Sequence, residues 1–382
     1  MDVTLPKKEL VRLVGRCQGV ADKKSTMPAL SNVLLSVSGP SELRVAATDL
    51  YLSVSGVASG VQVRKGGSVA VPARDLFERI KMMPDGPIHV TTNDGFSTVV
   101  KAAATARRYT LRGMPGEDFP VIAEPEAGAP ELELELDLIS KLIARTHFSI
   151  STDETRAALN SALFEWDGDR VRMVTTDGHR LSKMEAEVPG RQATATMLLP
   201  LKAIGELRRL ADEAKGELGK DGGGEKVTIS QSGPNAFFRL AGTRFSVKLV
   251  DAQFPPYAQV IPQTTERALK IPRGAFADAL RAVALAASDR TGGVKLEVAS
   301  GSMRITSESP ETGDGFDEIP VEYTGPDVVI GFNARYFLDV LGAIDDDEIV
   351  LGIGGDLDPA VIRPASDDDE RGYKAIVMPM RI

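Results

Sequence analysis

Hydrophobic and polar residues follow two periods along the chain, and together these predict helices and strands in a repeating order. Six segments carry apolar residues at three- and four-residue steps, which is typical of a helix lying on a core. They are Lys7–Cys17, Ala73–Met83, Leu138–Arg145, Leu201–Leu210, Pro272–Ala284 and Asn333–Ile344. Runs of period two follow these segments, such as Val33–Val37, Leu159–Trp166 and Val294–Val298, and predict half-buried strands. We therefore expect an α+β fold in which helices pack on antiparallel sheets.

Two pairs of landmarks in the chain share one spacing. Thr48-Asp49 and Thr176-Asp177 lie 128 residues apart, and so do Val71-Pro72 and Leu199-Pro200. This period has the size of a whole domain and exceeds the period of about 20–50 residues found in solenoid repeats. The helical segments recur in a third, fainter copy. We therefore predict three tandem domains of the same topology over residues 1–128, 129–266 and 267–382, each with two helices packed on antiparallel sheets.

Composition supports several packed cores and argues against a membrane protein. The chain has 382 residues, of which 42% are hydrophobic, and it has no apolar run long enough to span a bilayer. Met1–Leu10 lacks the apolar segment of a secretory signal. Cys17 is the only cysteine and lies on the apolar face of the first helix, so we expect a buried thiol. These features predict a cytoplasmic protein without membrane contact.

Charge is distributed unevenly between the two ends of the chain. The formal net charge is −9, but residues 1–122 carry 16 basic and 11 acidic side chains, whereas residues 267–382 carry 12 and 21. One interpretation is a solvated surface with uneven charge. The other is that the basic end of one copy docks on the acidic end of another, head to tail.

Basic residues also recur at helical spacing on the polar sides of the predicted helices. The sets are Lys8, Arg12 and Arg16; Arg74 and Lys81; Lys141 and Arg145; Lys202 and Arg209; and Arg273 and Arg281. An ordinary solvated face explains any one of these stripes. If all the helices faced one way, the stripes would form a positive lining that attracts a phosphate backbone without reading bases.

Catalytic patterns are weak in this sequence. The three histidines are His89, His147 and His179. His179 lies beside Asp177 in an expected turn, where the pair could perform acid–base chemistry, but the sequence marks no nucleophile nearby. An enzyme that uses Asp177 and His179 is one alternative, and in that case His179→Ala would abolish a chemical activity.

Metal-binding and cofactor-binding patterns are equally weak. The acidic runs Asp345–Asp347 and Asp367–Glu370 lack the alternate spacing of a calcium loop. The run Gly222–Gly224 lacks the Gly-Lys-Ser/Thr ending of a phosphate-binding loop. We therefore expect solvated loops at these positions, with no metal and no cofactor.

Several segments together resemble the bacterial DNA sliding clamps, which are the β subunits of the replicative DNA polymerase III. The most specific are Thr176–Leu181, Phe254-Pro255 with Tyr257, and Val377–Arg381, supported by Val71–Arg74 and by Arg156 before Leu159-Asn160. The resemblance covers the whole chain. It implies a head-to-tail homodimer that closes as a ring around double-stranded DNA. Such a ring is not an enzyme; it tethers the polymerase and confers processivity.

The resemblance also implies a groove that receives short peptide motifs from the DNA polymerase III catalytic subunit, the clamp loader and other clamp-binding proteins. Where the motifs match, its walls are Leu159, Thr176, Gly178, His179, Arg180, Leu181, Pro255, Val260, Ile376, Met378, Pro379, Met380 and Arg381. The Met-Pro-Met tail points to such a groove independently, because methionine suits surfaces that accept varied peptides. His179 is then a wall of the groove rather than a base.

Contacts with DNA and with a second subunit follow from the same resemblance. It implies DNA contacts at Lys24, Arg74 and Lys202, and a subunit interface that includes Tyr109 and Leu111 in the first domain and Leu285 in the third.

The chain departs from its relatives at a few of these positions. Ala157 and Ala158 stand where relatives often carry aromatic residues, and Gln259 stands where some carry a basic one, so stacking and peptide affinity are expected to differ. A specialised clamp paralogue acting in repair or inhibitor resistance would keep the same ring and groove, and it is a second alternative.

Overall fold

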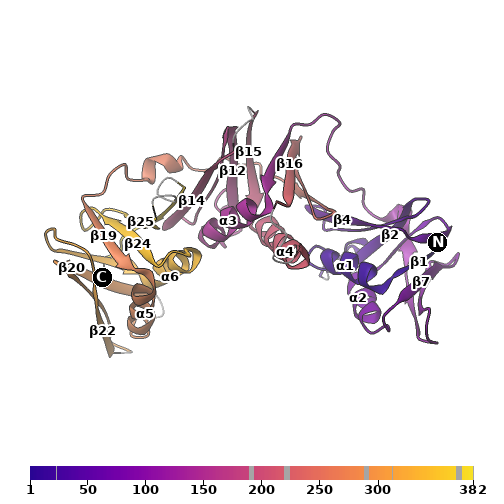
Figure 1. Ribbon diagram of the computed structural model, residues 1–382, viewed down its shortest axis with the longest axis horizontal. Helices are drawn as coiled ribbons and strands as arrows, with labels where there is room; N and C mark the ends of the chain where they lie inside the picture. Colours follow the sequence, from indigo (N-terminus) through magenta and orange to yellow (C-terminus); the bar gives the residue numbers. More distant parts are fainter. Residues whose placement is uncertain are drawn as a thin grey trace. The chain divides into compact units, whose positions relative to one another are not determined.

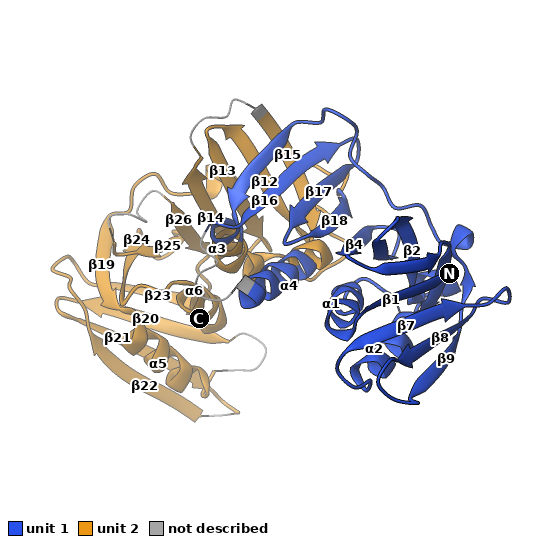
Figure 2. Cartoon of the chain, turned by 45° about the vertical axis from the view of Figure 1, so that its right-hand side comes forward, with its two compact units in different colours: residues 1–139, 205–249 blue, residues 140–204, 250–382 orange. Residues whose placement is uncertain are grey.

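The computed structural model describes residues 1–22, 24–188, 193–218, 224–287, 292–311, 313–366 and 372–381. They divide between two compact units (Figure 2). Unit 1 comprises Met1–Ile139 and Gly205–Leu249, and unit 2 comprises Ser140–Ile204 and Val250–Ile382. The acidic run Asp367–Glu370 and the glycines Gly222 and Gly223 lie outside the described residues.

The first third of the chain contains the helices α1 and α2 and a series of strands (Figure 1). In chain order the elements are β1 (Asp2–Pro6), α1 (Lys7–Cys17), the 3-10 helix η1 (Pro28–Ser31), β2 (Asn32–Gly39), β3 (Glu42–Thr48), β4 (Leu52–Ser59), β5 (Gln62–Lys65), β6 (Ser68–Pro72), α2 (Ala73–Lys81), β7 (Pro87–Thr92), β8 (Ser97–Ala102), β9 (Arg108–Arg112), β10 (Met114–Pro115) and η2 (Gly116–Asp118).

The second third repeats this order around α3 and α4. Its elements are β11 (Glu131–Glu135), α3 (Leu136–Thr146), η3 (His147–Ser149), β12 (Ser161–Gly168), β13 (Arg170–Thr176), β14 (Arg180–Glu187), β15 (Ala193–Pro200), α4 (Leu201–Leu218), β16 (Lys226–Ser232), β17 (Asn235–Leu240), β18 (Thr243–Lys248) and η5 (Tyr257–Val260). The boundaries between the two compact units fall inside α3 and α4 and after β18.

The last third repeats the order again around α5 and α6. Its elements are β19 (Arg267–Pro272), α5 (Arg273–Ala284), β20 (Gly293–Ala299), β21 (Ser302–Ser309), β22 (Gly313–Pro320), β23 (Val328–Asn333), α6 (Ala334–Ala343), β24 (Glu348–Ile353), β25 (Ala360–Pro364) and β26 (Tyr373–Val377). Each third therefore contains strand, helix and three strands, twice over, and the first third adds the short strands β5 and β10. This order confirms the predicted α+β fold with one repeated topology; the exact domain boundaries stay a prediction.

The strands form antiparallel sheets within each unit. Among the described residues of unit 1 they are ordered β5-β1-β7-β8-β9 in one sheet and β10-β6-β2-β3-β4-β18-β17-β16-β11 in the other. In unit 2 the orders are β15-β12-β13-β14-β26-β25-β24-β19 and β22-β21-β20-β23. Two pairings matter most for function. In unit 1, β4 of the first third pairs with β18 of the second, and in unit 2, β14 of the second third pairs with β26 of the last.

Proline marks the change from strand to helix at several points in the chain. Helices α1, α2, α4 and α5 each begin at the residue after a proline, which is Pro6, Pro72, Pro200 or Pro272. Proline has no N–H group and fixes its own φ, so it is well suited to the start of a helix. Helix α6 begins differently, because the Asn333 side chain accepts a hydrogen bond from Arg335 N at 2.9 Å and caps the helix.

Candidate peptide-binding groove and basic surface residues

The turn between β13 and β14 is fixed by hydrogen bonds from its own side chains. Asp177 Oδ1 accepts hydrogen bonds from the backbone N–H groups of His179 and Arg180 at 2.9 and 3.0 Å. Thr176 Oγ1 accepts one from Gly178 N at 3.1 Å and donates one to Arg180 O at 2.6 Å. Gly178 has a φ of +95°, a conformation that favours glycine. The Thr-Asp-Gly-His-Arg sequence therefore specifies one rigid turn.

Arg180 anchors this turn to two other elements of unit 2. Its Nε donates to Asp177 Oδ2 at 3.0 Å, its Nη1 donates to Asp339 on α6, and its Nη2 donates to Phe148 O in η3. Its guanidinium group also lies 4.7 Å from the centre of the Tyr336 ring. Only 10% of the Arg180 side chain is exposed. Arg180 is therefore a positioning residue that holds the turn in place.

His179 lies on the outside of the turn. Its side chain is exposed, and its ring stacks on Tyr336 with 6.5 Å between ring centres and 16° between ring planes. Burial and the nearby Asp177 carboxylate raise the pKa of Tyr336.

Both carboxylate oxygens of Asp177 have partners within the turn. Oδ1 accepts a hydrogen bond from the backbone N–H of His179, and Oδ2 accepts one from the Arg180 side chain. Asp177 is therefore a structural residue of the turn.

The C-terminal segment runs directly beside this turn. Strand β26 pairs with β14, so that Leu181 lies opposite Ile376, and Met378 N donates to His179 O at 2.9 Å. Met380 N then donates to Gly331 O at 2.9 Å, which attaches the tail to β23. The predicted association of the Thr176–Leu181 turn with the apolar tail is present in the structure.

A cluster of apolar side chains lies under the turn and the tail. Its buried members come from neighbouring strands of one sheet and are Leu163, Val174, Leu181, Leu198, Val361 and Ile376. Val250, Phe254, Tyr257 and Ile261 of the segment after β18 pack against the cluster and are only partly buried. This arrangement is an apolar floor with a partly open side, as expected where an apolar side chain of a partner inserts.

Tyr257 ties the segment after β18 to the sheet. Its hydroxyl donates to Glu165 Oε2 at 2.8 Å and accepts from Arg172 Nη1 at 3.5 Å. Partial burial, followed by the hydrogen bond to Glu165, raises the pKa of the Tyr257 hydroxyl. The segment after β18 is therefore held by a polar contact at one end of the apolar floor.

The predicted groove residues fall into a buried set and an accessible set. Leu159, Thr176, Leu181 and Ile376 are buried, whereas Gly178, His179, Pro255, Val260, Met378 and Arg381 are exposed, and Arg180, Pro379 and Met380 lie between these extremes. Sequence reasoning missed Phe148, Tyr336 and Asp339, which hold Arg180 and His179 in place. Asp339 lies 159 residues from Arg180, and no local pattern in the sequence links the two.

The residues predicted to contact DNA all have accessible side chains. Lys24, Arg74 and Lys202 are exposed in the loop after α1, in the first turn of α2 and in the first turn of α4. Within unit 1, Gln18 Nε2 donates to Ala73 O at 3.0 Å, which attaches the end of α1 to the start of α2. Whether these side chains contact DNA stays a prediction.

Both interpretations of the helical basic stripes, a solvated face or a positive lining, place their arginines at the surface, and this is wrong at two positions. Arg16 is only 2% exposed, with Nε 3.1 Å from Glu213 Oε1 and Nη2 2.8 Å from Glu217 Oε2. Its Nη1 also donates to Ala241 O and to Thr243 Oγ1. Arg145 is likewise buried, at 3% exposure. Acceptors from distant elements surround the Arg16 guanidinium group, whereas that of Arg145 lies 5.3 Å from the centre of the Tyr373 ring. Both arginines therefore belong to the interior, although the helical spacing alone places them at the surface.

Cys17 lies beside the Arg16 network and is buried, as predicted. Burial raises the pKa of the thiol to about 12. Arg209 on α4 donates to Arg16 O at 2.7 Å and pairs with Glu206 and Glu213. Burial opposes its charge, but these carboxylates outweigh that effect and raise the pKa of Arg209. The thiol therefore stays protonated inside an ion-pair network.

The predicted interface residues differ in their exposure. Leu285 follows α5 and is 83% exposed, Tyr109 on β9 is half-buried, and Leu111 on the same strand is only 2% exposed. A Cβ atom added at Gly315 on β22 would lie 3.1 Å from Ala286 Cβ, so the segment that carries Leu285 packs beside β22. Among the described residues, β9 and β22 are each paired on one edge only.

The other two histidines have structural partners. His89 Nε2 lies 2.7 Å from Asp2 Oδ1, a carboxylate 87 residues away that sequence spacing did not reveal. His147 Nδ1 lies 3.0 Å from Ile143 O. Across the described residues no group of three His, Cys, Asp or Glu side chains could hold a metal ion. The described helices also include none that is long and apolar enough to cross a membrane.

Comparison with known proteins places the whole chain in one family. The DNA polymerase III beta subunit families match residues 1–123 as the N-terminal domain, 133–256 as the central domain and 258–381 as the C-terminal domain. The beta sliding clamp of Caulobacter vibrioides strain NA1000 is 32% identical, and the match covers 100% of both chains.

Solved structures agree with this placement. The DNA polymerase III subunit beta from Pseudomonas aeruginosa is 30% identical with a TM-score of 0.91, and a sliding clamp from Bartonella birtlesii bound to griselimycin is 32% identical with a TM-score of 0.91. Each match covers 100% of both chains. The fold and these matches thus define a protein of three tandem clamp domains. The chain belongs to the bacterial beta sliding clamp family, the DNA polymerase III beta subunits.

Proposed function

We propose that this chain forms a head-to-tail homodimeric ring around double-stranded DNA and tethers the DNA polymerase III catalytic subunit, the clamp loader and other motif-bearing partners to it. The ring is a processivity factor and performs no catalysis. Membership of the sliding clamp family supports this proposal. The observation that carries it is the tail after β26, which lies beside the rigid Thr176–Leu181 turn along an apolar floor.

The groove suits a short linear peptide with an apolar anchor side chain. Leu181, Ile376 and their neighbours form the floor on which that side chain gains hydrophobic contact. Met378 lies at the edge with 38% of its surface exposed, and its flexible thioether adapts to anchors of different shape. The His179–Tyr336 stack supplies a flat second wall. Partners with different sequences can therefore share this one site.

The two free sheet edges suit a head-to-tail interface between copies. Strand β9 carries Arg108 and Arg112, whereas β22 carries Asp314, Asp317 and the exposed Phe316. An unpaired edge strand readily adds a strand from another chain through main-chain hydrogen bonds. Opposite charges favour β9 of one copy against β22 of the next, and disfavour like edges meeting. Two such joints close a dimer.

DNA contacts in a sliding ring need only be weak. Lys24, Arg74 and Lys202 present accessible positive charges that phosphates attract at every base step, without reading sequence. The ring stays on DNA because it is closed, and weak contacts let it move. The net charge of −9 reduces adhesion of DNA elsewhere on the protein.

Binding of the polymerase to groove variants tests this function. We expect Met378→Asp to weaken binding of the cognate polymerase catalytic subunit at least about tenfold in surface plasmon resonance, because it places a charge at the edge of an apolar site. Leu357→Asp is the matched control, since Leu357 is an exposed apolar residue of the same unit outside the predicted groove. Equal affinities for the two variants would contradict the proposed groove.

A further inference from the structure

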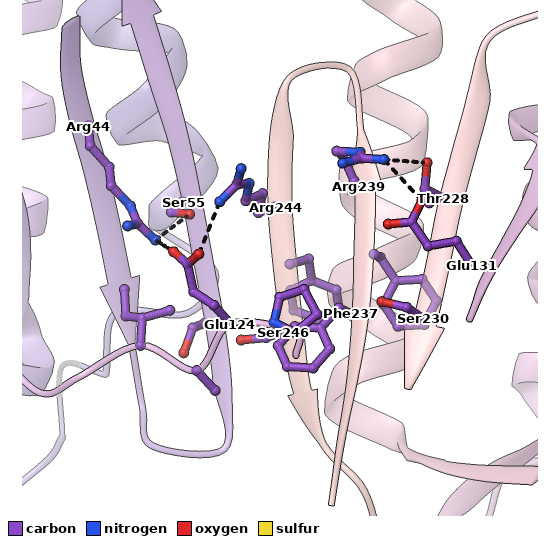
Figure 3. A pocket seen from close by; sticks show the side chains of 16 residues that line it. Arg44, Ser55, Glu124, Glu131, Thr228, Ser230, Phe237, Arg239, Arg244 and Ser246 are labelled. Atoms are coloured by element: carbon purple, nitrogen blue, oxygen red, sulfur yellow. Dashed lines mark hydrogen bonds and ion pairs between the residues drawn. The ribbon is translucent and has the colours of Figure 1, made fainter. Parts of the chain in front are cut away.

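Unit 1 contains a pocket that no predicted site explains. Its volume is about 160 Å³, and it lies against β3, β4 and β16–β18 with the linker residues 122–125 along one side (Figure 3). Pockets that hold whole small molecules measure about 300–1,000 Å³. This pocket is therefore of a size for one anchoring side chain rather than for a cofactor.

The strand pairing shows that this pocket occupies the position of the groove in the previous copy of the repeat. In unit 2, Leu181 on β14 lies opposite Thr176 on β13 and Ile376 on β26. In unit 1, Ser53 on β4 lies opposite Thr48 on β3 and Ser246 on β18, and 128 residues separate Ser53 from Leu181. Ser53 and Ser246, which correspond to two floor residues of the groove, both line the pocket.

The chemistry of this counterpart differs from that of the groove floor, because serine and arginine side chains lie beside apolar ones. Leucine and isoleucine at two floor positions are replaced by Ser53 and Ser246. By the same pairing, Phe237 stands for Val361 of the groove. Three arginines, Arg44, Arg239 and Arg244, also line the pocket. An anionic side chain therefore meets guanidinium and hydroxyl donors here, beside the apolar side chains of Phe237, Phe238 and Phe245.

The pocket already holds a carboxylate from the linker. Glu124 Oε1 lies 3.0 Å from Arg44 Nη2, and Glu124 Oε2 lies 3.3 Å from Arg244 Nη1. Figure 3 shows Glu124 between these two arginines, with Arg239 beside Glu131 on the other side of the pocket. The arginine at position 172, 128 residues beyond Arg44, also contacts the segment that follows its sheet, there through a hydrogen bond of 3.5 Å to the neutral Tyr257 hydroxyl. The linker contact is thus a repeated feature.

The Glu124 contact is of a kind that another carboxylate can replace. The Glu124 side chain is 48% exposed, and residues 120–126 form neither helix nor strand, so release of Glu124 breaks no sheet. The pocket lining has three arginines against Glu124 and Glu131, which leaves one positive charge. Exposed ion pairs contribute little to stability, so another carboxylate can replace Glu124 at low cost.

We propose that this pocket is a second peptide-binding site, in which an acidic side chain of a partner's linear segment replaces Glu124 between Arg44 and Arg244. The occupant is an acidic peptide, because Arg44 and Arg244 already hold the side-chain carboxylate of Glu124 from a segment without helix or strand. The groove in unit 2 and the pocket in unit 1 then select partners of different chemistry, apolar in one and acidic in the other.

A peptide that copies the linker tests the proposal in the full-length protein. The probe is a fluorescein-labelled, end-blocked peptide with the sequence of residues 119–126, read by fluorescence anisotropy at low salt. In Glu124→Gln the segment 120–126 no longer supplies the competing carboxylate, so we expect this variant to bind the probe about three- to fivefold more tightly than the unmodified chain. Adding Arg44→Gln to Glu124→Gln should restore weak binding. Arg244 is 62% exposed, so Arg244→Gln is a second such variant that is expected to fold.

Two controls separate the proposal from simpler explanations. Arg304 is a strand arginine of unit 2 that pairs with Glu318, and adding Arg304→Gln to Glu124→Gln should leave probe binding unchanged. A probe with glutamine at the position of Glu124 should bind weakly. The proposal is overturned if Glu124→Gln does not bind the probe more tightly, or if loss of Arg44 or Arg244 has no effect. It is also overturned if the glutamine probe binds equally well, or if inorganic phosphate displaces the probe at lower concentration than unlabelled peptide does, which would indicate a general anion site.

Discussion

Arg180 on β14 donates a hydrogen bond from Nη1 to Asp339 Oδ2 on α6, across 159 residues of chain. This bond joins the turn that borders the groove to a helix of the last third. Without it, the guanidinium group would remain largely buried with one charge partner fewer. The shape of the proposed groove should therefore depend on a residue outside it.

Replacing Asp339 tests this dependence. We expect Asp339→Ala to lower the free energy of unfolding by about 1–3 kcal/mol, because a mostly buried charge loses a partner. Polymerase binding should weaken about three- to tenfold as the turn loosens. Chemical denaturation and surface plasmon resonance measure the two effects. Asp356→Ala, at an exposed position of unit 2, is the control and should change neither.

Arg16 and Arg74 should separate a structural arginine from a DNA-contacting one. Arg16→Ala removes the partner of Glu217 and one of the two arginines that pair with Glu213, and it should destabilise the protein by about 1–3 kcal/mol. Arg74→Ala should leave the melting temperature unchanged but weaken DNA binding and reduce its salt dependence. Differential scanning fluorimetry and DNA-binding titrations in increasing salt measure these outcomes. A stable Arg16→Ala variant would show that the buried network is dispensable.

Cys17 should resist thiol reagents in the folded protein. Its pKa of about 12, raised from an ordinary 9.0, keeps the thiol protonated at neutral pH, and burial excludes the reagent. We expect labelling at pH 8 about a hundredfold slower than in denaturant. The raised pKa also means that this group stabilises the fold below pH 9.0 and loses that contribution as the pH rises toward 12. Rapid labelling of the native protein would contradict this assignment.

Charge reversal tests the proposed pairing of β9 with β22. A chain with Arg108→Glu and Arg112→Glu, and another with Asp314→Lys and Asp317→Lys, should each dissociate more readily, because like charges then meet at the joint. An equimolar mixture should recover dimer, since one joint is unmodified and the other has both charges reversed. Analytical ultracentrifugation gives the masses. Recovery of dimer in the mixture would support the pairing of β9 with β22. If the mixture stays dissociated, the interface lies elsewhere.

Local periodicity predicted the helices well because each one packs a single apolar face. The predicted Lys7–Cys17 agrees with α1 at both ends, whereas α4 continues to Leu218, beyond the predicted Leu210. Its extension is polar and carries Glu213 and Glu217, whose partner Arg16 is distant in sequence. Strand β4 was not predicted, because it is buried on both faces over most of its length and its apolar and polar residues show little alternation.

The turn and tail of the groove could be predicted because each has an unusual local sequence. Their supports could not be, because Phe148, Tyr336 and Asp339 reach Arg180 only through the fold. The sequence alone could not show that the pocket in unit 1 corresponds to the groove floor, because this correspondence follows from the pairing of Ser53 with Ser246 in the sheet.

The lifetime of the protein on circular and linear DNA tests the central claim of a closed ring most directly. Protein loaded on a nicked circular duplex is followed before and after a single cut that linearises the DNA. We predict long retention on the circle and rapid loss from the linear form, because a topological link has no other exit than a free end. Equal lifetimes on the two forms would contradict the ring.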